Sequence, residues 1–173
     1  MQDDVDIVFA GDSITYQGFW SDFFPEFSIS NQGIGSDISE GLLNRVQYII
    51  ERNPEQIFLM VGTNDLGLQL DSDELVSNVE ATIKEIHKEL PEAQIYLQSI
   101  LPTNTGHNEE SKLVNQQYEK IANSYDSVTY IDLYPLYEVD GNQNPALFQE
   151  DGVHLNGEGY EVWIDAIEKY VNK

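Results

Sequence analysis

Hydrophobic residues in this chain follow two patterns that alternate from one end to the other. Short apolar runs rich in β-branched and aromatic residues predict buried strands, and longer segments with apolar residues every three or four positions predict amphipathic helices. The predicted strands are residues 5–10, 27–31, 56–61, 94–100 and 128–133. The predicted helices are residues 36–52, 71–90, 109–125 and 157–171.

The clearest helix signal covers residues 71–90 and stops at Pro91, which cannot continue a helix. Its apolar face consists of Leu75, Val79, Ile83, Ile86 and Leu90. For the helix over residues 36–52, the predicted N-cap is Ser36 or Asp37, because short polar side chains accept hydrogen bonds from the first free amides of a helix.

The alternation of strands and helices, with no repeat and no linker, predicts an α/β fold built on a parallel sheet. We expect a single three-layer α/β/α domain over residues 1–173 with a five-stranded parallel sheet, since this length suits one domain. Ligands of such open sheets bind beyond the carboxyl ends of the strands. The loops that follow the strands are therefore the first place to look for chemistry.

Four of these loops are polar and contain glycine. Residues 11–13 (GDS) follow the first strand, residues 31–37 (NQGIGSD) the second, and residues 62–65 (GTND) the third. Residues 151–156 (DGVHLN) lie between the fifth strand and the last helix. We expect the four segments to converge on one edge of the sheet.

The residues in these loops are chemically complementary. A serine hydroxyl such as that of Ser13 is a weak nucleophile at neutral pH unless a base takes its proton. His154 can accept and return that proton, and Asp151 lies three residues earlier, where a local turn can orient the imidazole. A tetrahedral oxyanion would need preorganised donors, which the Asn64 amide and backbone N–H groups of Ser13 and of residues 31–37 can supply.

The segments GDSIT, GTND and DGVHL, in this order, resemble the SGNH (GDSL) hydrolase superfamily of esterases and lipases. The resemblance extends over about residues 5–163. It implies a flavodoxin-like three-layer fold and a serine hydrolase without metal or cofactor. It also implies the roles of individual residues: Ser13 as nucleophile, Asn64 as oxyanion donor, and Asp151 with His154 as the rest of the triad.

One position departs from the family pattern. The family usually has glycine immediately before the aspartate of the second loop, where its backbone N–H contacts the oxyanion. Here Ser36 occupies that position, and Gly35 is the second candidate for the backbone donor. We therefore expect the geometry of this loop, and the width of the acyl pocket, to depend on Ser36.

Charge and composition narrow the classes of partner. The chain has 31 acidic and 8 basic residues, a net charge of -23, and no cysteine, which excludes disulfides and thiolate chemistry. Such a surface repels phosphate backbones and anionic lipids, so we expect no nucleic-acid partner. No apolar stretch is long enough to span a membrane, and the first residues do not resemble a signal peptide. We expect no membrane insertion and a cytoplasmic location, with secretion and the oligomeric state left open.

Other polar and aromatic residues have supporting roles in this interpretation. Asp12 and Asp65 are expected to bind backbone amides and shape their loops. His87 is expected to be solvated, and His107 is a weak candidate for substrate contact. We expect an aromatic rim around the site, formed by Tyr16, Phe19, Trp20, Tyr134 and Tyr137. Incomplete calcium-loop and phosphate-loop patterns predict neither a metal nor a cofactor.

The predicted function is hydrolysis of short-chain, acetyl-type esters, such as O-acetylated carbohydrate, through an acyl-enzyme. The expected partner is a small-molecule or carbohydrate ester. One alternative is a lysophospholipase or platelet-activating-factor acetylhydrolase-like lipid esterase. Another, of a different class, is a non-catalytic glycan-binding module with the same fold.

Overall fold

The computed structural model describes residues 4–172 and contains the predicted five-stranded parallel sheet. Its strands are β1 (Ile7–Gly11), β2 (Ile29–Gly33), β3 (Gln56–Met60), β4 (Gln94–Gln98) and β5 (Val128–Ile131). Their order is β2-β1-β3-β4-β5, so the chain turns to one side of β1 and then to the other. Such a reversal opens a crevice beyond the carboxyl ends of β1 and β3.

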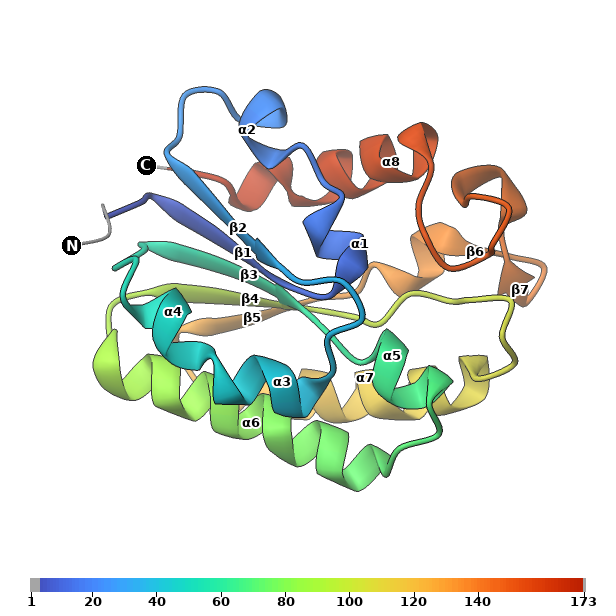
Figure 1. Ribbon diagram of the computed structural model, residues 1–173, viewed down its shortest axis with the longest axis horizontal. Coiled ribbons are helices and arrows are strands. Elements are labelled where there is room, and N and C mark those ends of the chain that lie inside the picture. The colour runs from blue at the N-terminus through green and yellow to red at the C-terminus, as the bar shows by residue number, and fades with distance from the viewer. Residues whose placement is uncertain (1–3, 173) are drawn as a thin grey trace.

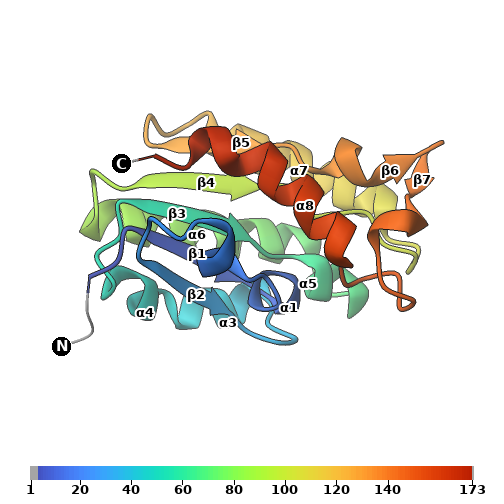
Figure 2. The same ribbon diagram turned by 90° about the horizontal axis from the view of Figure 1, so that it is seen from above.

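Helices cover both faces of the sheet and produce the predicted three layers (Figure 1, Figure 2). One face carries α3 (Ser39–Asn44), α4 (Val46–Ile50), α5 (Thr63–Gly67), α6 (Ser72–Glu89) and α7 (Asn108–Ala122). The other face carries α1 (Ser13–Tyr16), α2 (Trp20–Phe23) and α8 (Gly157–Ile167). The remaining elements are the 3-10 turns η1 (Tyr134–Tyr137), η2 (Pro145–Leu147) and η3 (Glu168–Tyr170) and the short strands β6 (Glu138–Val139) and β7 (Asn142–Gln143).

Side chains of the central strands alternate between two hydrophobic cores. On β1, Val8 and Ala10 pack with α3, α4 and α6, whereas Ile7 and Phe9 pack with α8 and α2. All four side chains are fully buried, because each face of the sheet is covered. This two-sided burial explains why the strands are almost continuously apolar in sequence.

An aromatic stack crosses the sheet on the α8 side. Phe9, Phe58 and Tyr96 occupy the same register on β1, β3 and β4, with ring centroids 4.9 and 4.6 Å apart. Trp20 stacks on Phe9 at 4.0 Å, and its indole N–H donates to the carbonyl of Thr15 at 2.9 Å. The stack fixes the α1–α2 segment against the sheet.

The predicted aromatic rim is therefore wrong for three of its members. Trp20 belongs to the stack, Tyr134 is buried, and Tyr137 is fully buried with its hydroxyl donating to the Gly159 carbonyl at 2.7 Å. Tyr16 and Phe19 are the two that reach the surface, with exposed fractions of 63% and 71%.

The helix predicted over residues 36–52 is also wrong in its bounds, because the structure has two short helices, α3 and α4, separated at Arg45. Arg45 has φ -112° and ψ 12°, outside the helical range. Neither predicted cap is used: the N-cap of α3 is Ile38, whereas Ser36 has a left-handed φ of 61°. Asp37 instead pairs with Arg45.

The other long helices lie where they were predicted, although α7 ends at Ala122 and α8 at Ile167, before the predicted ends at residues 125 and 171. α6 begins at Ser72 with Asp71 as its side-chain cap, and its predicted apolar residues from Leu75 to Ile86 are buried. His87, expected to be solvated, is only partly exposed, because its ring lies 3.1 Å from the Ser127 hydroxyl. Within residues 4–172, none of the helices has the length and apolar character needed to cross a membrane.

Candidate active site

Ser13 begins α1 immediately after β1, at the reversal point of the sheet. The preceding Asp12 caps this helix, and its Oδ1 accepts from the Ile14 N–H at 2.9 Å, which confirms its predicted loop-shaping role. The turn lies hard against β3: a Cβ on Gly11 would stand 2.1 Å from the Met60 carbonyl oxygen. Only glycine allows the Ser13 turn to sit this close to its neighbour.

The structure brings Ser13, His154 and Asp151 into one hydrogen-bonded chain. His154 Nε2 lies 2.9 Å from Ser13 Oγ, and His154 Nδ1 lies 2.6 Å from Asp151 Oδ2. The other Asp151 oxygen accepts from the backbone N–H groups of Val153 and His154, each at 2.9 Å. Burial raises the pKa of Asp151, but these hydrogen bonds from His154 and Val153 lower it to about 2. Asp151 is therefore ionised at neutral pH and orients the imidazole.

Contacts that the sequence did not predict hold the loop that carries Asp151 and His154. Gly152 has φ 65°, and the Asn104 amide fills the space that a Cβ would need. The Gly152 carbonyl accepts from the Asn104 N–H at 3.1 Å and from the Gln143 amide. The Gln149 N–H donates to the His154 carbonyl at 2.7 Å. The sequence signal that could have identified Asn104 is its position in the loop after β4.

The three predicted oxyanion donors come from three different segments. Ser13 is the first residue of α1, where a helix leaves its N–H without an intrahelical partner. Asn64 lies in α5, and its amide donates one hydrogen to the Asp37 carbonyl at 2.8 Å, leaving a second hydrogen for another acceptor. The conformation of Ser36, at φ 61°, is one that glycine adopts at lower cost, which agrees with the glycine that the family resemblance implies for this position. Gly35 has open space around it.

Two buried carboxylates, those of Asp12 and Asp65, are next to the predicted donors Ser13 and Asn64 in the sequence. Asp65 accepts from the Ser39 N–H at 3.1 Å, as expected of a residue that shapes its loop, and the Ser39 hydroxyl also donates to it. Burial raises the pKa of Asp65, and the hydrogen bonds from Ser39 partly offset that rise. Burial likewise raises the pKa of Asp12 to about 7, although the Ile14 N–H and His154 lower it. Among the described residues, Asp12 Oδ2 has no hydrogen-bond partner.

Three exposed apolar side chains come from segments next to the Ser13 turn. Tyr16 ends α1 and Phe19 lies three residues further on, and both are mostly exposed, whereas Ile34, directly after β2, is 47% exposed. Gly33 permits this arrangement, because a Cβ there would lie 2.2 Å from the Tyr16 nitrogen. His107 caps α7 and accepts from the Ser111 hydroxyl through its carbonyl at 3.0 Å.

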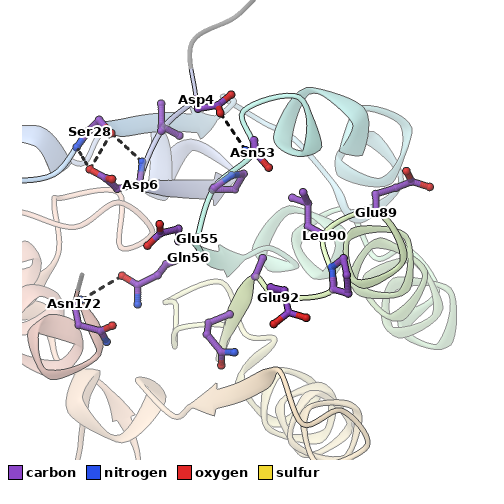
Figure 3. Close-up of a pocket in the computed structure, with 15 residues that line it drawn as sticks. Asp4, Asp6, Ser28, Asn53, Glu55, Gln56, Glu89, Leu90, Glu92 and Asn172 are labelled. Carbon is purple, nitrogen blue, oxygen red and sulfur yellow. Dashed lines mark hydrogen bonds between the residues drawn. The ribbon is translucent and has the colours of Figure 1, made fainter.

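A hollow of about 730 Å³ lies at the opposite end of the sheet, where β1, β3 and β4 begin (Figure 3). Its carboxylates are those of Asp4, Asp6, Glu55, Glu89 and Glu92. Asp6 accepts from the Ser28 N–H at 2.7 Å, and Asp4 accepts from the Asn53 amide at 3.1 Å. Ser13, Asp151 and His154 do not line this hollow. No cluster of three or more His, Asp or Glu side chains within residues 4–172 is placed to hold a metal ion.

A hydrogen-bonded serine, histidine and aspartate at the reversal point of a flavodoxin-like sheet is an arrangement that serine hydrolases use, esterases among them. The chain belongs to the GDSL-like lipase/acylhydrolase family, whose model matches residues 9–162. This family comprises lipases and acylhydrolases, which are ester hydrolases, the class of enzyme that the sequence predicts.

Several known proteins are similar to this chain. A platelet-activating factor acetylhydrolase IB subunit beta homolog of Drosophila melanogaster is 33% identical over 57% of this chain and 46% of its own length. The multidomain esterase of Ruminococcus flavefaciens is 30% identical over 76% of this chain and 18% of its own length. The chain thus spans less than half of these two curated relatives.

Solved structures share the fold closely. A Streptococcus pneumonia protein, provisionally described as a platelet activating factor, has a TM-score of 0.89 and 28% identity, covering 96% of this chain and 84% of that one. A GDSL-like lipase from Bacteroides thetaiotaomicron has a TM-score of 0.84 and 23% identity, covering 95% of this chain and 86% of that one. The predicted fold class and family are both confirmed.

Proposed function

We propose that residues 1–173 form one hydrolase domain that cleaves short-chain carboxylic esters through an acyl-enzyme on Ser13. The observation that carries this proposal is the hydrogen-bonded chain from Ser13 Oγ through His154 to Asp151, with separations of 2.9 and 2.6 Å. A binding module needs no such nucleophile and base pair.

In the acylation step, Ser13 Oγ attacks the ester carbonyl carbon while His154 Nε2 takes the hydroxyl proton. The tetrahedral intermediate collapses, the bond to the leaving oxygen breaks, and His154 returns the proton to the departing alcohol. Water then attacks the acyl carbon while His154 takes its proton, the bond to Ser13 Oγ breaks, and His154 returns the proton to Ser13 as the carboxylic acid leaves. Asp151 stays ionised throughout, since its pKa is about 2.

The carbonyl oxygen becomes negative in both steps and needs donors that are already in place. In this proposal the donors are the N–H groups of Ser13 and Ser36 and the second amide hydrogen of Asn64, with the Gly35 N–H as the alternative to Ser36. Removing one such donor typically slows catalysis about 10²- to 10³-fold.

The proposed substrates are acetyl-type esters, including O-acetylated carbohydrate. The exposed rings of Tyr16 and Phe19 offer flat apolar faces beside Ser13, on which a sugar ring can pack. The net charge of -23 disfavours anionic substrates. The similarity to the multidomain esterase of Ruminococcus flavefaciens supports hydrolysis of an ester bond.

A lipid ester is the second candidate, because one relative is named as a platelet-activating factor acetylhydrolase subunit homolog. The apolar side chains of Tyr16, Phe19 and Ile34 would then contact the lipid instead of a sugar. Both candidates share the reaction at Ser13 and differ in the group that packs on this surface.

The test is hydrolysis of p-nitrophenyl acetate, butyrate and octanoate by the wild type, by Ser13→Ala and by Ser21→Ala, a matched control at an exposed serine on α2. We expect acetate to be the fastest substrate, with activity lost in Ser13→Ala and kept in Ser21→Ala. Rates that rise toward octanoate would favour the lipid ester. Equal, feeble rates from the wild type and Ser13→Ala, together with sugar binding by both, would favour the glycan-binding module.

An acetylated oligosaccharide and a 2-acetyl glycerophosphocholine then separate the two substrate classes directly. Release of acetate from the first and not from the second supports the carbohydrate ester.

A further inference from the structure

Arg45 connects two of the loops that meet at the candidate active site. Its Nε donates to Asp37 Oδ2 at 2.8 Å, and its Nη2 donates to the Gly11 carbonyl at 3.0 Å. The side chains of Arg45 and Asp37 are each only 11% exposed. One guanidinium therefore spans from the Ser13 turn to the loop that contains Ser36.

Asp37 extends this connection to the third segment. Its carbonyl accepts from the Asn64 amide at 2.8 Å, while its carboxylate accepts from the Ile38 N–H at 3.1 Å and pairs with Arg45. A Cβ at Gly41 would lie 2.0 Å from Asp37 Oδ1, so glycine makes room for the carboxylate. Each predicted oxyanion donor therefore either bonds to Asp37 or lies within two residues of a group that forms or accepts one of these hydrogen bonds.

The relative placement of the donors depends on these contacts. Gly11 precedes Ser13 by two residues, Ser36 is adjacent to Asp37, and Asn64 bonds directly to Asp37. The N-cap of α3, Ile38, makes no side-chain cap hydrogen bond, and Ser36 holds a left-handed φ of 61° that disfavours residues other than glycine. External contacts must therefore keep this loop in place.

We propose that Arg45 is a positioning residue that, together with Asp37, aligns the three oxyanion donors for the reaction at Ser13; this inference rests on the proposed function. Arginine suits the task because its planar fork donates in two fixed directions, whereas lysine offers a single point charge. Preorganised donors act on the transition state, so their misalignment lowers kcat more than it raises KM.

An ion pair that served only stability would behave differently. Breaking it would lower the unfolding free energy, but the folded molecules would keep their kcat. The decisive readouts are therefore kcat and KM for the folded protein, alongside the affinity for a boronic acid, which forms a tetrahedral adduct with a reactive serine and needs the same donors.

The experiment compares the wild type with Arg45→Gln, Arg45→Lys, Asp37→Asn and Lys84→Gln, the last removing a charge from an exposed position on α6. We expect Arg45→Gln to lower kcat by about 10- to 100-fold, less than the complete loss of a donor. Its KM should change by less than about threefold, and its boronic acid affinity should fall by the same factor as kcat. Lys84→Gln should match the wild type.

Arg45→Lys keeps a charge beside Asp37 and guards against a failure of Arg45→Gln to fold. Its kcat should fall at least about fivefold, since lysine cannot reproduce both bonds. Wild-type kcat in folded Arg45→Lys and Asp37→Asn overturns the inference and leaves the proposed function intact. A wild type without Ser13-dependent turnover overturns the proposed function, and the inference with it.

Discussion

Replacing Asp12 by asparagine should remove a pH-dependent loss of stability. Asp12 is 1% exposed, its Oδ1 accepts from the Ile14 N–H, and its Oδ2 has no hydrogen-bond partner among the described residues. Burial raises its pKa from 3.8 to about 7 against the opposing effects of the Ile14 N–H and His154, and the neighbouring carboxylates Asp65 and Asp37 raise it further. Asparagine keeps the acceptor for Ile14 and carries no charge.

The magnitude follows from the linkage between protonation and folding. Folded Asp12 holds its proton up to about pH 7, whereas in the unfolded chain it releases the proton near pH 3.8. Stability therefore falls as the pH rises from about 4 and levels off above about 7. At about 1.4 kcal/mol per pKa unit, the full loss is about 4 kcal/mol, of which about 2 to 3 kcal/mol falls between about pH 5 and about pH 8.

Urea unfolding of the wild type and Asp12→Asn at these two pH values measures the difference. The variant should gain about 2 to 3 kcal/mol relative to the wild type on going from about pH 5 to about pH 8. Taking the difference between the two proteins cancels the titration of groups that do not interact with Asp12. The reasoning fails if the two proteins show the same change in unfolding free energy between the two pH values.

Three further predictions concern the site. Asp151→Asn should lower kcat about 10⁴-fold, because the imidazole loses its orienting carboxylate. Since the pKa of Asp151 is about 2, its titration should cause no change in the wild-type rate between about pH 4 and about pH 9. Measuring kcat of both proteins over this pH range checks both expectations. Asn64→Ala should lower kcat about 10²- to 10³-fold with little change in KM, and unchanged steady-state kinetics would contradict its role as an oxyanion donor. Ser36→Gly should retain kcat, since the backbone N–H is unchanged. It should also shift stability by about 0 to +1 kcal/mol, because relief of the φ of 61° is partly offset by the greater freedom of unfolded glycine; urea unfolding that shows a clear loss would refute this.

Much of the fold could be predicted from local pattern. The central strands are apolar runs whose side chains meet a core on each face, whereas the edge strand β2 is mostly polar. The stripe from Leu75 to Ile86 predicted α6 because helical periodicity needs only nearby residues. The short helices α1, α2 and α5 were missed, since four or five residues do not form a periodic pattern.

The site was predictable to the extent that it lies in loops after strands. Ser13, Asn64 and the segment with His154 are far apart in sequence, but a parallel sheet brings strand ends to one edge, so their convergence follows from the fold class. The contacts that hold them were not predictable. Asn104, in the loop after β4, and Gln143, in the short strand β7, both bind the Gly152 carbonyl, and nothing in their local sequence identifies that partner.

The sequence by itself determined the class of fold, the family and the residues that carry the candidate chemistry, because these depend on periodicity and on motifs that local order preserves. Only the tertiary structure decided that Trp20 stacks on Phe9 inside the core while Phe19, its neighbour in the chain, is exposed. Only the structure showed that the helix breaks at Arg45, whose guanidinium reaches Asp37 and Gly11. The physical reason is the same in each case. Burial and hydrogen bonding depend on contacts between residues distant in sequence, and the local pattern does not identify the partner.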